Sequence, residues 1–371
     1  MPKKVIISGG GTGGHIFPAV AIADALKRLE PETEILFVGA IGRMEMERVP
    51  AAGYQVIGLD IQGFQRKQLF KNILLPYKII SSVLKARSVI KSFKPDVAVG
   101  VGGYASGPLL FAAGQMKVPY LIQEQNSYAG ITNKWLAKKA ARICVAFDGM
   151  EQFFPPAAIM ITGNPVRSES VDIAGKRGEA AAFFGLSAEK RTILVTGGSL
   201  GARTLNASVL AGLEKIMAAD VQLIWQTGKF YYKGIIEKVG NQPKDLRIRV
   251  LEFLQRMDLA YAMADVIISR AGAGTIAELC IVKKPVILVP SPNVAEDHQT
   301  KNALALVKND ATVLVTDAEA ENKLVDTALQ VLGDPEKCVQ LGERIGKLAL
   351  PMADEVIANE VLKLVKQHGA G

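Results

Sequence analysis

Short apolar runs alternate with longer amphipathic segments along this chain. Near the N-terminus, the apolar run 5–8 leads through a glycine-rich loop to an amphipathic stretch at 19–29, and a second apolar run follows at 34–38. This order predicts a strand, a loop, a helix and a second strand. Short apolar strands that alternate with helices are typical of parallel sheets covered by helices on both faces.

The same pattern returns nearly half a chain later. The apolar run 192–196 leads into another glycine loop, which is followed by a predicted helix at about 204–217 and a predicted strand at 222–226. A chain of 371 residues is too long for one ordinary core. The repeated opening therefore predicts an α/β protein with two Rossmann-like, doubly wound domains, each built on a parallel sheet.

The boundary between the domains is predicted at 163–166, a Gly-Asn-Pro-Val sequence followed by a polar stretch. The N-terminal domain then covers residues 1–166 and the C-terminal domain residues 167–351. We expect a last helix, within residues 352–371, to pack back on the N-terminal domain. Ligands of open α/β sheets bind at the carboxyl ends of the strands, so we expect the site in a cleft between two facing domains.

Three glycine-rich loops follow predicted strands, at 9–14, 100–107 and 197–201. Glycine lets a phosphate approach the backbone, and a helix that starts at such a loop presents N–H groups at the positive end of its dipole. One such loop is as often a tight strand-to-helix turn, but three in one chain indicate anion binding. The first loop also spells GxGxxG. A dinucleotide site needs an acidic residue at the end of the second strand to hold the ribose, but that strand ends Phe37-Val38-Gly39-Ala40. No Walker lysine follows any loop either, so a dinucleotide site is disfavoured.

Composition disfavours several other classes. The net charge of +8 suits a nucleic acid, an anionic membrane or a phosphorylated small molecule. Only 6% of residues are aromatic, without basic-aromatic interleaving, so nucleic-acid binding is not expected. Cys144, Cys280 and Cys338 have no CxxC spacing, which disfavours a zinc site or a disulfide framework. No DxD pair is present, so we expect no metal site for a diphosphate.

Three polar positions in the first half of the chain are candidates for ligand binding or catalysis, each with a structural alternative. The run 123–126 follows the predicted strand 119–122 and could face a ligand or form a surface turn. Arg167 at the hinge could bind a phosphate or pair with a carboxylate. His15, at the end of the first glycine loop, could act as a base near neutral pH or only hydrogen-bond the loop.

Two further candidates lie in the C-terminal half. After the predicted strand 265–268, Thr275 and Glu278 match a capping box, but Glu278 could instead accept ribose hydroxyls. The segment 297–299 could start a helix capped by Asp297, or offer its histidine and glutamine to sugar hydroxyls.

Residues 61–94 carry eight cations and no acid. A helix is predicted from Pro76, with an apolar stripe of Ile79, Ile80, Val83, Leu84, Ile90 and Phe93. The part of the stripe within 83–93 is expected to pack on the sheet, whereas residues 64–80 carry more apolar surface than a loop needs. Apolar groups flanked by cations suit an anionic bilayer surface. The predicted membrane contacts are Phe64, Arg66, Lys67, Phe70, Lys71, Ile73, Leu74 and Lys78. We expect neither a signal peptide nor a transmembrane span, because the N-terminus lacks an apolar core segment and the longest uncharged stretch, 97–116, is interrupted by glycines.

Seven motifs, taken in order, resemble one family over essentially the whole chain. They are GGGTGGHIFPA (9–19), KPDVAVGVGGYASGP (94–108), QEQNSYAGITNKWLA (123–137), GNPVR (163–167), GGSLGAR (197–203), RAGAGTIAE (270–278) and DHQTKNA (297–303). This set resembles the bacterial UDP-N-acetylglucosamine:N-acetylmuramyl-(pentapeptide) pyrophosphoryl-undecaprenol N-acetylglucosamine transferases of glycosyltransferase family 28.

The resemblance implies a GT-B fold whose N-terminal domain binds the acceptor and whose C-terminal domain binds most of the donor. It implies an inverting hexosyltransferase that moves N-acetylglucosamine from UDP-GlcNAc to the muramyl 4-hydroxyl of lipid I. The products would be lipid II and UDP, in peptidoglycan synthesis, with no cofactor required. The implied location is peripheral, at the cytoplasmic face of the inner membrane. Roles in cell shape, cell division and the cell cycle, with other cell-wall or division proteins as partners, are implied as well.

The family's site residues can be carried over position by position. The implied contacts of UDP-GlcNAc are Thr12, Gly13, Gly14, Asn126, Arg167, Ser199, Leu254, Ala273, Gly274, Thr275, Ile276, Ala277, Glu278 and Gln299. Within this set, Glu278 is expected to hold the ribose, and the Leu254 backbone to line the uracil pocket. Candidates for the acceptor pyrophosphate are Gly11, Gly103 and Tyr104. Leu200 stands where many members have glutamine, so no donor contact is expected from its side chain.

The implied mechanism is a direct displacement. The muramyl hydroxyl attacks the anomeric carbon, and His15 or a nearby group takes the proton. Arg167 and the loop amides stabilise the departing UDP, and domain closure completes the site. Three other interpretations stay open: a related lipid glycosyltransferase with another acceptor such as diacylglycerol, a GT-B sugar epimerase, and a non-catalytic scaffold that binds nucleotide sugars at the membrane.

Overall fold

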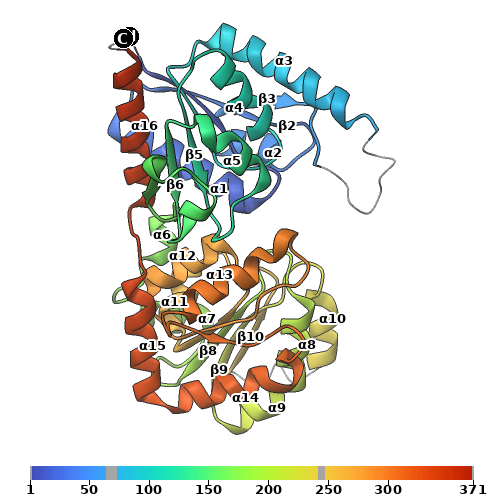
Figure 1. Cartoon of the computed structure of the whole chain (residues 1–371). Coiled ribbons are helices and arrows are strands. Elements are labelled where there is room, and N and C mark those ends of the chain that lie inside the picture. Colours follow the sequence, from blue (N-terminus) through green and yellow to red (C-terminus); the bar gives the residue numbers. More distant parts are fainter. Residues whose placement is uncertain (1, 64–72, 241–246, 370–371) are drawn as a thin grey trace. The chain divides into compact units, whose positions relative to one another are not determined.

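The chain divides into two compact units in a computed structural model that describes residues 2–63, 73–240 and 247–369 (Figure 1). Residues 1–166 and 350–371 form the N-terminal unit, and residues 167–349 form the C-terminal unit. The first boundary falls at the expected hinge. The second lies at 350, close to the expected start of the last helix at 352.

A parallel sheet forms the centre of the N-terminal unit. Among the described residues seven strands pair in the order β3-β2-β1-β4-β5-β6-β7, and every pair is parallel. The strands are β1 (Lys4–Ser8), β2 (Glu34–Ala40), β3 (Gln55–Leu59), β4 (Val97–Gly100), β5 (Tyr120–Glu124), β6 (Arg142–Val145) and β7 (Ile159–Ile161). The strand order reverses between β1 and β4, and ligands of such sheets bind at this switch point.

Helices cover both faces of this sheet. They are α1 (Gly13–Leu29), α2 (Glu45–Ala51), α3 (Leu75–Phe93), α4 (Ser106–Gln115), α5 (Ile131–Leu136) and α16 (Ala353–Gly369), with short 3₁₀ turns η2 (Ala137–Lys139), η3 (Met150–Gln152) and η4 (Pro156–Ala158). Neighbouring residues of β1 point to opposite faces: Val5 and Ile7 pack with α1 and α16, whereas Ile6 packs with α3 and α4. Helix α16, red in Figure 1, contributes Ile357 and Val361 to the first of these cores, as expected for a last helix that returns to the N-terminal domain.

The C-terminal unit repeats the architecture. Six strands of its described residues pair in parallel in the order β10-β9-β8-β11-β12-β13. The strands are β8 (Thr192–Thr196), β9 (Gln222–Gln226), β10 (Ile248–Leu251), β11 (Val266–Ser269), β12 (Val286–Leu288) and β13 (Val313–Leu314). The helices are α6 (Ser168–Val171), α7 (Arg177–Phe184), α8 (Arg203–Ala211), α9 (Leu213–Ala218), α10 (Tyr232–Val239), α11 (Met257–Met263), α12 (Ala273–Val282), α13 (His298–Val307), α14 (Ala320–Gly333) and α15 (Pro335–Lys347), with the 3₁₀ turn η6 (Ala295–Asp297).

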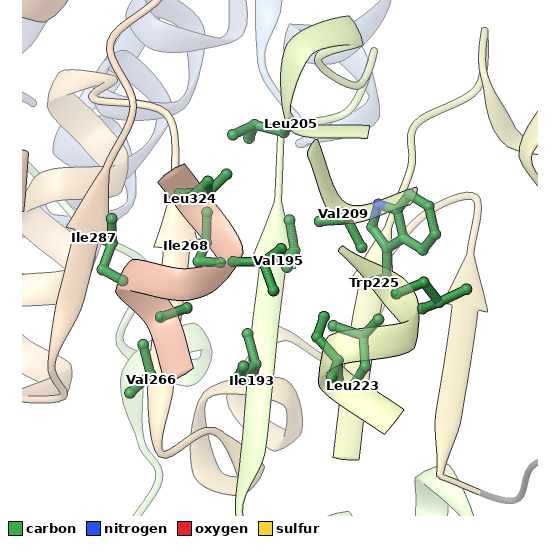
Figure 2. Packing of buried hydrophobic residues seen from close by; sticks show 14 of the residues in the cluster. Ile193, Val195, Leu205, Val209, Leu223, Trp225, Val266, Ile268, Ile287 and Leu324 are labelled. Atoms are coloured by element: carbon green, nitrogen blue, oxygen red, sulfur yellow. The ribbon is translucent and has the colours of Figure 1, made fainter. Parts of the chain in front are cut away.

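One face of this second sheet is buried under α8 and α14. Figure 2 shows side chains of β8, β9 and β11 packed with Leu205 and Val209 of α8 and Leu324 of α14. Trp225 of β9 is fully buried here, and its Nε1 donates a hydrogen bond to Asn206 Oδ1 at 2.9 Å. The buried indole is therefore both packed and paired, which fixes α8 on the sheet.

Several predicted elements appear at their expected positions. The strands at 192–196 and 222–226 are confirmed at both ends. The first helix begins at Gly13 rather than at residue 19, so the last glycines of the first loop form its first turn. The helix predicted at 204–217 is two helices, α8 and α9, which meet at Gly212.

The predicted packing of residues 83–93 is confirmed except at one position. Ile90 is buried and Val83 and Phe93 are half-buried, but Leu84 is exposed by 60%. Ile79 and Ile80, which precede this part of the helix, are exposed as well, Ile80 by 61%. The residues that α3 buries are Ser82, Ala86, Val89 and Ile90. The helix carries apolar residues on more than one face, and the face with small side chains is the one that packs on α4.

Candidate functional site

A pocket of about 980 Å³ opens at the carboxyl edge of the C-terminal sheet. The last residues of three strands line it, namely Thr196 of β8, Gln226 of β9 and Ser269 of β11. Strands β8 and β11 are neighbours at the point where the strand order reverses. The pocket thus occupies the switch point of this sheet, where doubly wound domains bind their ligands.

The glycine loop after β8 forms one wall of the pocket. Gly198 and Gly201 have φ of +80° and +82°, and the Gly201 N–H donates to Gly198 O at 2.9 Å. This turn leads into α8, so backbone N–H groups and a helix N-terminus face the same place. Ser199, predicted as a donor contact, is exposed on this wall. The arrangement suits a phosphate group.

Glu278 of α12 also lines the pocket and is held by a buried tyrosine. Tyr261 of α11 is fully buried, and its hydroxyl donates to Glu278 Oε2 at 2.9 Å. Burial raises the pKa of the Glu278 carboxyl above its usual value, while the Tyr261 hydrogen bond and the positive charge of Arg167 oppose that rise. Tyr261 thereby fixes one carboxylate oxygen and leaves the other for a ligand.

The capping-box interpretation of this segment is wrong. The N-cap of α12 is Gly272, and Thr275 lies in the first turn of the helix, so it is not a capping residue. Glu278 accepts its hydrogen bond from Tyr261. The sequence alone could not separate these cases, because capping depends on where the helix begins.

Four more of the residues predicted to contact the donor belong to α12, and a fifth is Leu254. Ala273, Gly274 and Ala277 belong to the first two turns of α12, whose backbone is accessible at the helix start. The side chains of Ile276 and Leu254 are buried, so either residue could contact a ligand only through its backbone.

Gln299 lines the pocket from α13. Its Oε1 accepts the Ser291 N–H at 2.9 Å, which leaves the amide NH₂ as the group that can reach a ligand. Asp297 is at the N-cap of α13, but its side chain accepts from the Thr300 hydroxyl rather than from a backbone N–H.

One cation in this pocket, Arg270, was not predicted from the sequence as a site residue. Arg270 pairs with Asp317 at 2.5 Å and also donates to the Val289 and Pro290 carbonyls. Asp317 in turn accepts from the Thr204 hydroxyl at 2.9 Å. The charge of Arg270 is therefore compensated within the protein. Its partner lies 47 residues away, so no local spacing could have revealed the pair.

In the N-terminal unit, the first glycine loop lies against the loop after β4. Gly10 N–H donates to Gly102 O at 3.3 Å, and a Cβ on Gly103 would meet the Gly10 backbone. Gly103 has a φ of +90°, and the exposed Tyr104 follows it. Thr12, Gly13 and Gly14 form the N-cap and first turn of α1. These predicted contacts therefore gather at one sheet edge.

Two residues set the chemistry of this loop. His15 Nδ1 lies 3.1 Å from Gly10 O and 3.3 Å from Thr12 Oγ1. A ring nitrogen beside a carbonyl oxygen must carry the hydrogen, so in the neutral ring Nε2 has the lone pair of a base. The N–H of Gly11 donates to the carboxylate of buried Glu45 at 2.8 Å. While this bond is made, the N–H of Gly11 is not available to a pyrophosphate.

The polar run 123–126 is mostly structural. Strand β5 extends to Glu124, so Gln123 and Glu124 lie inside the sheet, and both are buried. Gln123 donates to Asn164 Oδ1 at 2.9 Å, and Glu124 accepts from the Gly130 N–H at 3.0 Å. Gln125 and Asn126 lie beyond the strand. Gln125 is buried and donates to Val101 O at 2.7 Å, whereas Asn126 is half-buried and can serve as a ligand contact.

The predicted membrane contacts fall partly within the described residues. Phe64, Arg66, Lys67, Phe70 and Lys71 lie outside them. Ile73 and Leu74 are exposed, and Lys78 pairs with Asp60 at 2.8 Å. Helix α3 is drawn in cyan in Figure 1.

Across residues 2–63, 73–240 and 247–369, no helix is both long and apolar enough to cross a bilayer. Within the same ranges, no three His, Cys, Asp or Glu side chains are grouped so that they could hold a metal ion.

Known proteins resemble the chain along its length. Residues 5–145 match the glycosyltransferase family 28 N-terminal domain, and residues 192–349 match the glycosyltransferase family 28 C-terminal domain. A UDP-N-acetylglucosamine--N-acetylmuramyl-(pentapeptide) pyrophosphoryl-undecaprenol N-acetylglucosamine transferase of Bacteroides fragilis is 60% identical over 365 residues, covering 98% of this chain and 96% of its own. The protein of the same name from Bacteroides thetaiotaomicron is 58% identical and covers 98% of both chains.

Solved structures agree with these relatives. The crystal structure of Acinetobacter baumannii MurG superimposes with a TM-score of 0.80 at 28% identity, covering 98% of this chain and all of that one. The calicheamicin glycosyltransferase CalG4 matches with a TM-score of 0.70 at 14% identity, covering 99% of each chain, which reports on the fold alone. The two parallel-sheet units are those of the GT-B fold, and the chain belongs to glycosyltransferase family 28, among the UDP-N-acetylglucosamine--N-acetylmuramyl-(pentapeptide) pyrophosphoryl-undecaprenol N-acetylglucosamine transferases.

Proposed function

We propose that this protein transfers N-acetylglucosamine from UDP-GlcNAc to the muramyl 4-hydroxyl of lipid I, with inversion, to give lipid II and UDP. The observation that carries the proposal is the pocket of the C-terminal unit, which combines a glycine turn for phosphates with the carboxylate of Glu278. The names of relatives at 60% and 58% identity specify the same donor and acceptor. The C-terminal unit binds the donor, and the N-terminal unit binds the acceptor.

The residues have separate roles in this reaction. Glu278 accepts the ribose hydroxyls through the oxygen that Tyr261 does not use. The amides around Ser199 and at the start of α12 stabilise the negative charge on the leaving UDP. The acceptor O4 attacks C1 of the sugar, the bond from C1 to the diphosphate oxygen breaks, and the hydroxyl proton passes to Nε2 of His15. No cofactor takes part, and the developing charge is stabilised by the backbone and by Arg167.

The protein acts at the cytoplasmic face of the inner membrane, where its acceptor is anchored. Helix α3 supports this location, because Tyr77, Ile80 and Leu84 are exposed, as are the neighbouring cations Lys85 and Arg87. Apolar groups of this kind enter the headgroup region, and the cations attract anionic lipids. Because lipid II is used to build the cell wall, we also propose that the protein takes part in cell division and contacts other cell-wall proteins.

A transfer assay tests the reaction directly. We expect labelled N-acetylglucosamine to pass from UDP-GlcNAc to a short-chain lipid I analogue only when both substrates are present, and to do so in the presence of a chelator. Turnover of UDP-GlcNAc alone would instead identify an epimerase. UDP binding without transfer would contradict the proposed acceptor, and loss of activity in chelator would contradict the absence of a metal.

Tyr261→Phe tests how Glu278 is held. The substitution keeps the buried ring but removes the hydroxyl that donates to Glu278. We expect UDP to bind about tenfold more weakly, since a hydrogen bond to a charged group contributes about 1.5–3 kcal/mol. The preference for UDP over 2′-deoxy-UDP should also fall. Tyr54→Phe is the matched control, because Tyr54 donates to Asp24 at 2.6 Å in the other unit. Equal calorimetric affinities for Tyr261→Phe and wild type would contradict the role.

Glu278→Gln tests whether the negative charge of the buried carboxylate lowers the stability of the fold. An acid whose folded-state pKa is raised adds stability at low pH, and this stability is lost as the pH rises through the raised pKa. Glutamine still accepts from Tyr261 but carries no charge. We therefore expect the variant to melt at a higher temperature than wild type at neutral pH, with the difference vanishing below about pH 4. Its UDP affinity should fall. A variant that melts lower at neutral pH would show that the carboxylate stabilises the fold.

Membrane binding can be tested on α3. Replacing Ile80 and Leu84 together by serine removes two exposed apolar side chains, each of which contributes about 1 kcal/mol or more on burial. We expect sedimentation with vesicles that contain phosphatidylglycerol to weaken at least about tenfold. Val339→Ser is the control, since Val339 is equally exposed, at 60%, on α15. Unchanged vesicle binding by the double variant would exclude α3 as the contact.

A further inference from the structure

A buried carboxylate lies under the glycine loop of the N-terminal unit. Glu45 is 1% exposed, and its two oxygens accept two backbone N–H groups, Gly11 at 2.8 Å and Ala40 at 2.9 Å. A Cβ on Gly10 or on Gly39 would collide with this side chain, so both backbones approach it closely. The carboxylate thereby ties the turn after β2 to the glycine loop.

This arrangement changes what the loop can bind. An anionic ligand near Gly11 finds its N–H already paired and a carboxylate behind it. A pyrophosphate at this point therefore needs a positive side chain to offset the repulsion.

The same turn supplies such a side chain. The chain reverses between β2 and α2, with Gly42 at a φ of +72° and the Arg43 N–H bonded to Ala40 O at 3.2 Å. The guanidinium of Arg43 lies over the ring of Tyr104, 5.8 Å from its centroid. The ring of Tyr104 in turn lies beside Gly11, so Arg43 and the glycine loop share one aromatic neighbour.

Arg43 is also available to a ligand. It is exposed, and in the described part of the chain no carboxylate lies within ion-pair distance of it. A guanidinium that uses its face on an aromatic ring keeps its in-plane N–H groups for a partner, and their fork matches two phosphate oxygens.

We propose that Arg43 is the residue that binds the acceptor's pyrophosphate, held in place by Tyr104 and by the turn that Glu45 fixes. This inference rests on the proposed function, because it takes a lipid-linked sugar pyrophosphate as the acceptor. In this proposal the negative charge of the pyrophosphate is bound by Arg43, on the turn after β2, and not by the N–H of Gly11.

The test compares acceptor kinetics of Arg43→Ala, Arg43→Lys and wild type with the lipid I analogue. We expect Arg43→Ala to raise the KM for the acceptor about tenfold or more, with the KM for UDP-GlcNAc unchanged. Arg43→Lys should recover part of the loss, because it keeps the charge without the fork. Arg48→Ala is the control: it removes an exposed arginine of α2, a few residues after Arg43, and should behave as wild type.

A second acceptor distinguishes charge recognition from a general structural effect. With a muramyl-peptide that carries a methyl group in place of the pyrophosphate, Arg43→Ala and wild type should react equally. An equal penalty with both acceptors, or no penalty with lipid I, would overturn the role of Arg43 while leaving the proposed function intact. A wild-type protein that binds UDP but never uses the lipid I analogue would overturn the proposed function, and the acceptor role of Arg43 with it.

Discussion

Both candidate sites depend on a close contact between two backbone turns at the carboxyl edge of a sheet. In the N-terminal unit, a Cβ on Gly103 would meet the backbone of Gly10, and in the C-terminal unit a Cβ on Gly201 would meet Thr227 O. Gly103, Gly201 and Gly228 all have positive φ, which L side chains rarely adopt. Glycine is therefore required at these positions by packing and conformation together. The contact brings loops from neighbouring strands close enough to surround a phosphate.

Charged groups at these edges are paired before any substrate arrives. Glu45 holds two amides in the N-terminal unit, whereas Asp317 holds Arg270 in the C-terminal unit. One carboxylate oxygen of Glu278 accepts a hydrogen bond from the Tyr261 hydroxyl. Groups fixed in this way need little reorganisation when a charged ligand binds, which is how a rigid site gains selectivity. The charge of Arg43, which remains accessible, lies on the turn between β2 and α2.

The sequence could predict the repeating elements and the positions of the loops. Strands such as Thr192–Thr196 are short apolar runs bounded by polar residues and glycine, so their ends are visible in the chain itself. The roles of buried polar residues were not visible. Gln123 is paired with Asn164, 41 positions away, and Tyr261 with Glu278 on another helix. A polar residue that is satisfied by a distant partner has the same local pattern as one that faces a ligand.

Helix α3 shows why periodicity alone could not decide which face is buried. Both faces carry apolar residues, and Leu84, which was expected to pack, is about as exposed as Ile80. The helix instead packs on α4 through a face that includes Ser82 and Ala86, whose small side chains allow the two helices to approach closely. Because the small residues already satisfy the packing against α4, the large apolar residues are not needed by the core, and their exposure beside Lys85 and Arg87 follows from how the fold is packed rather than from a defect in it.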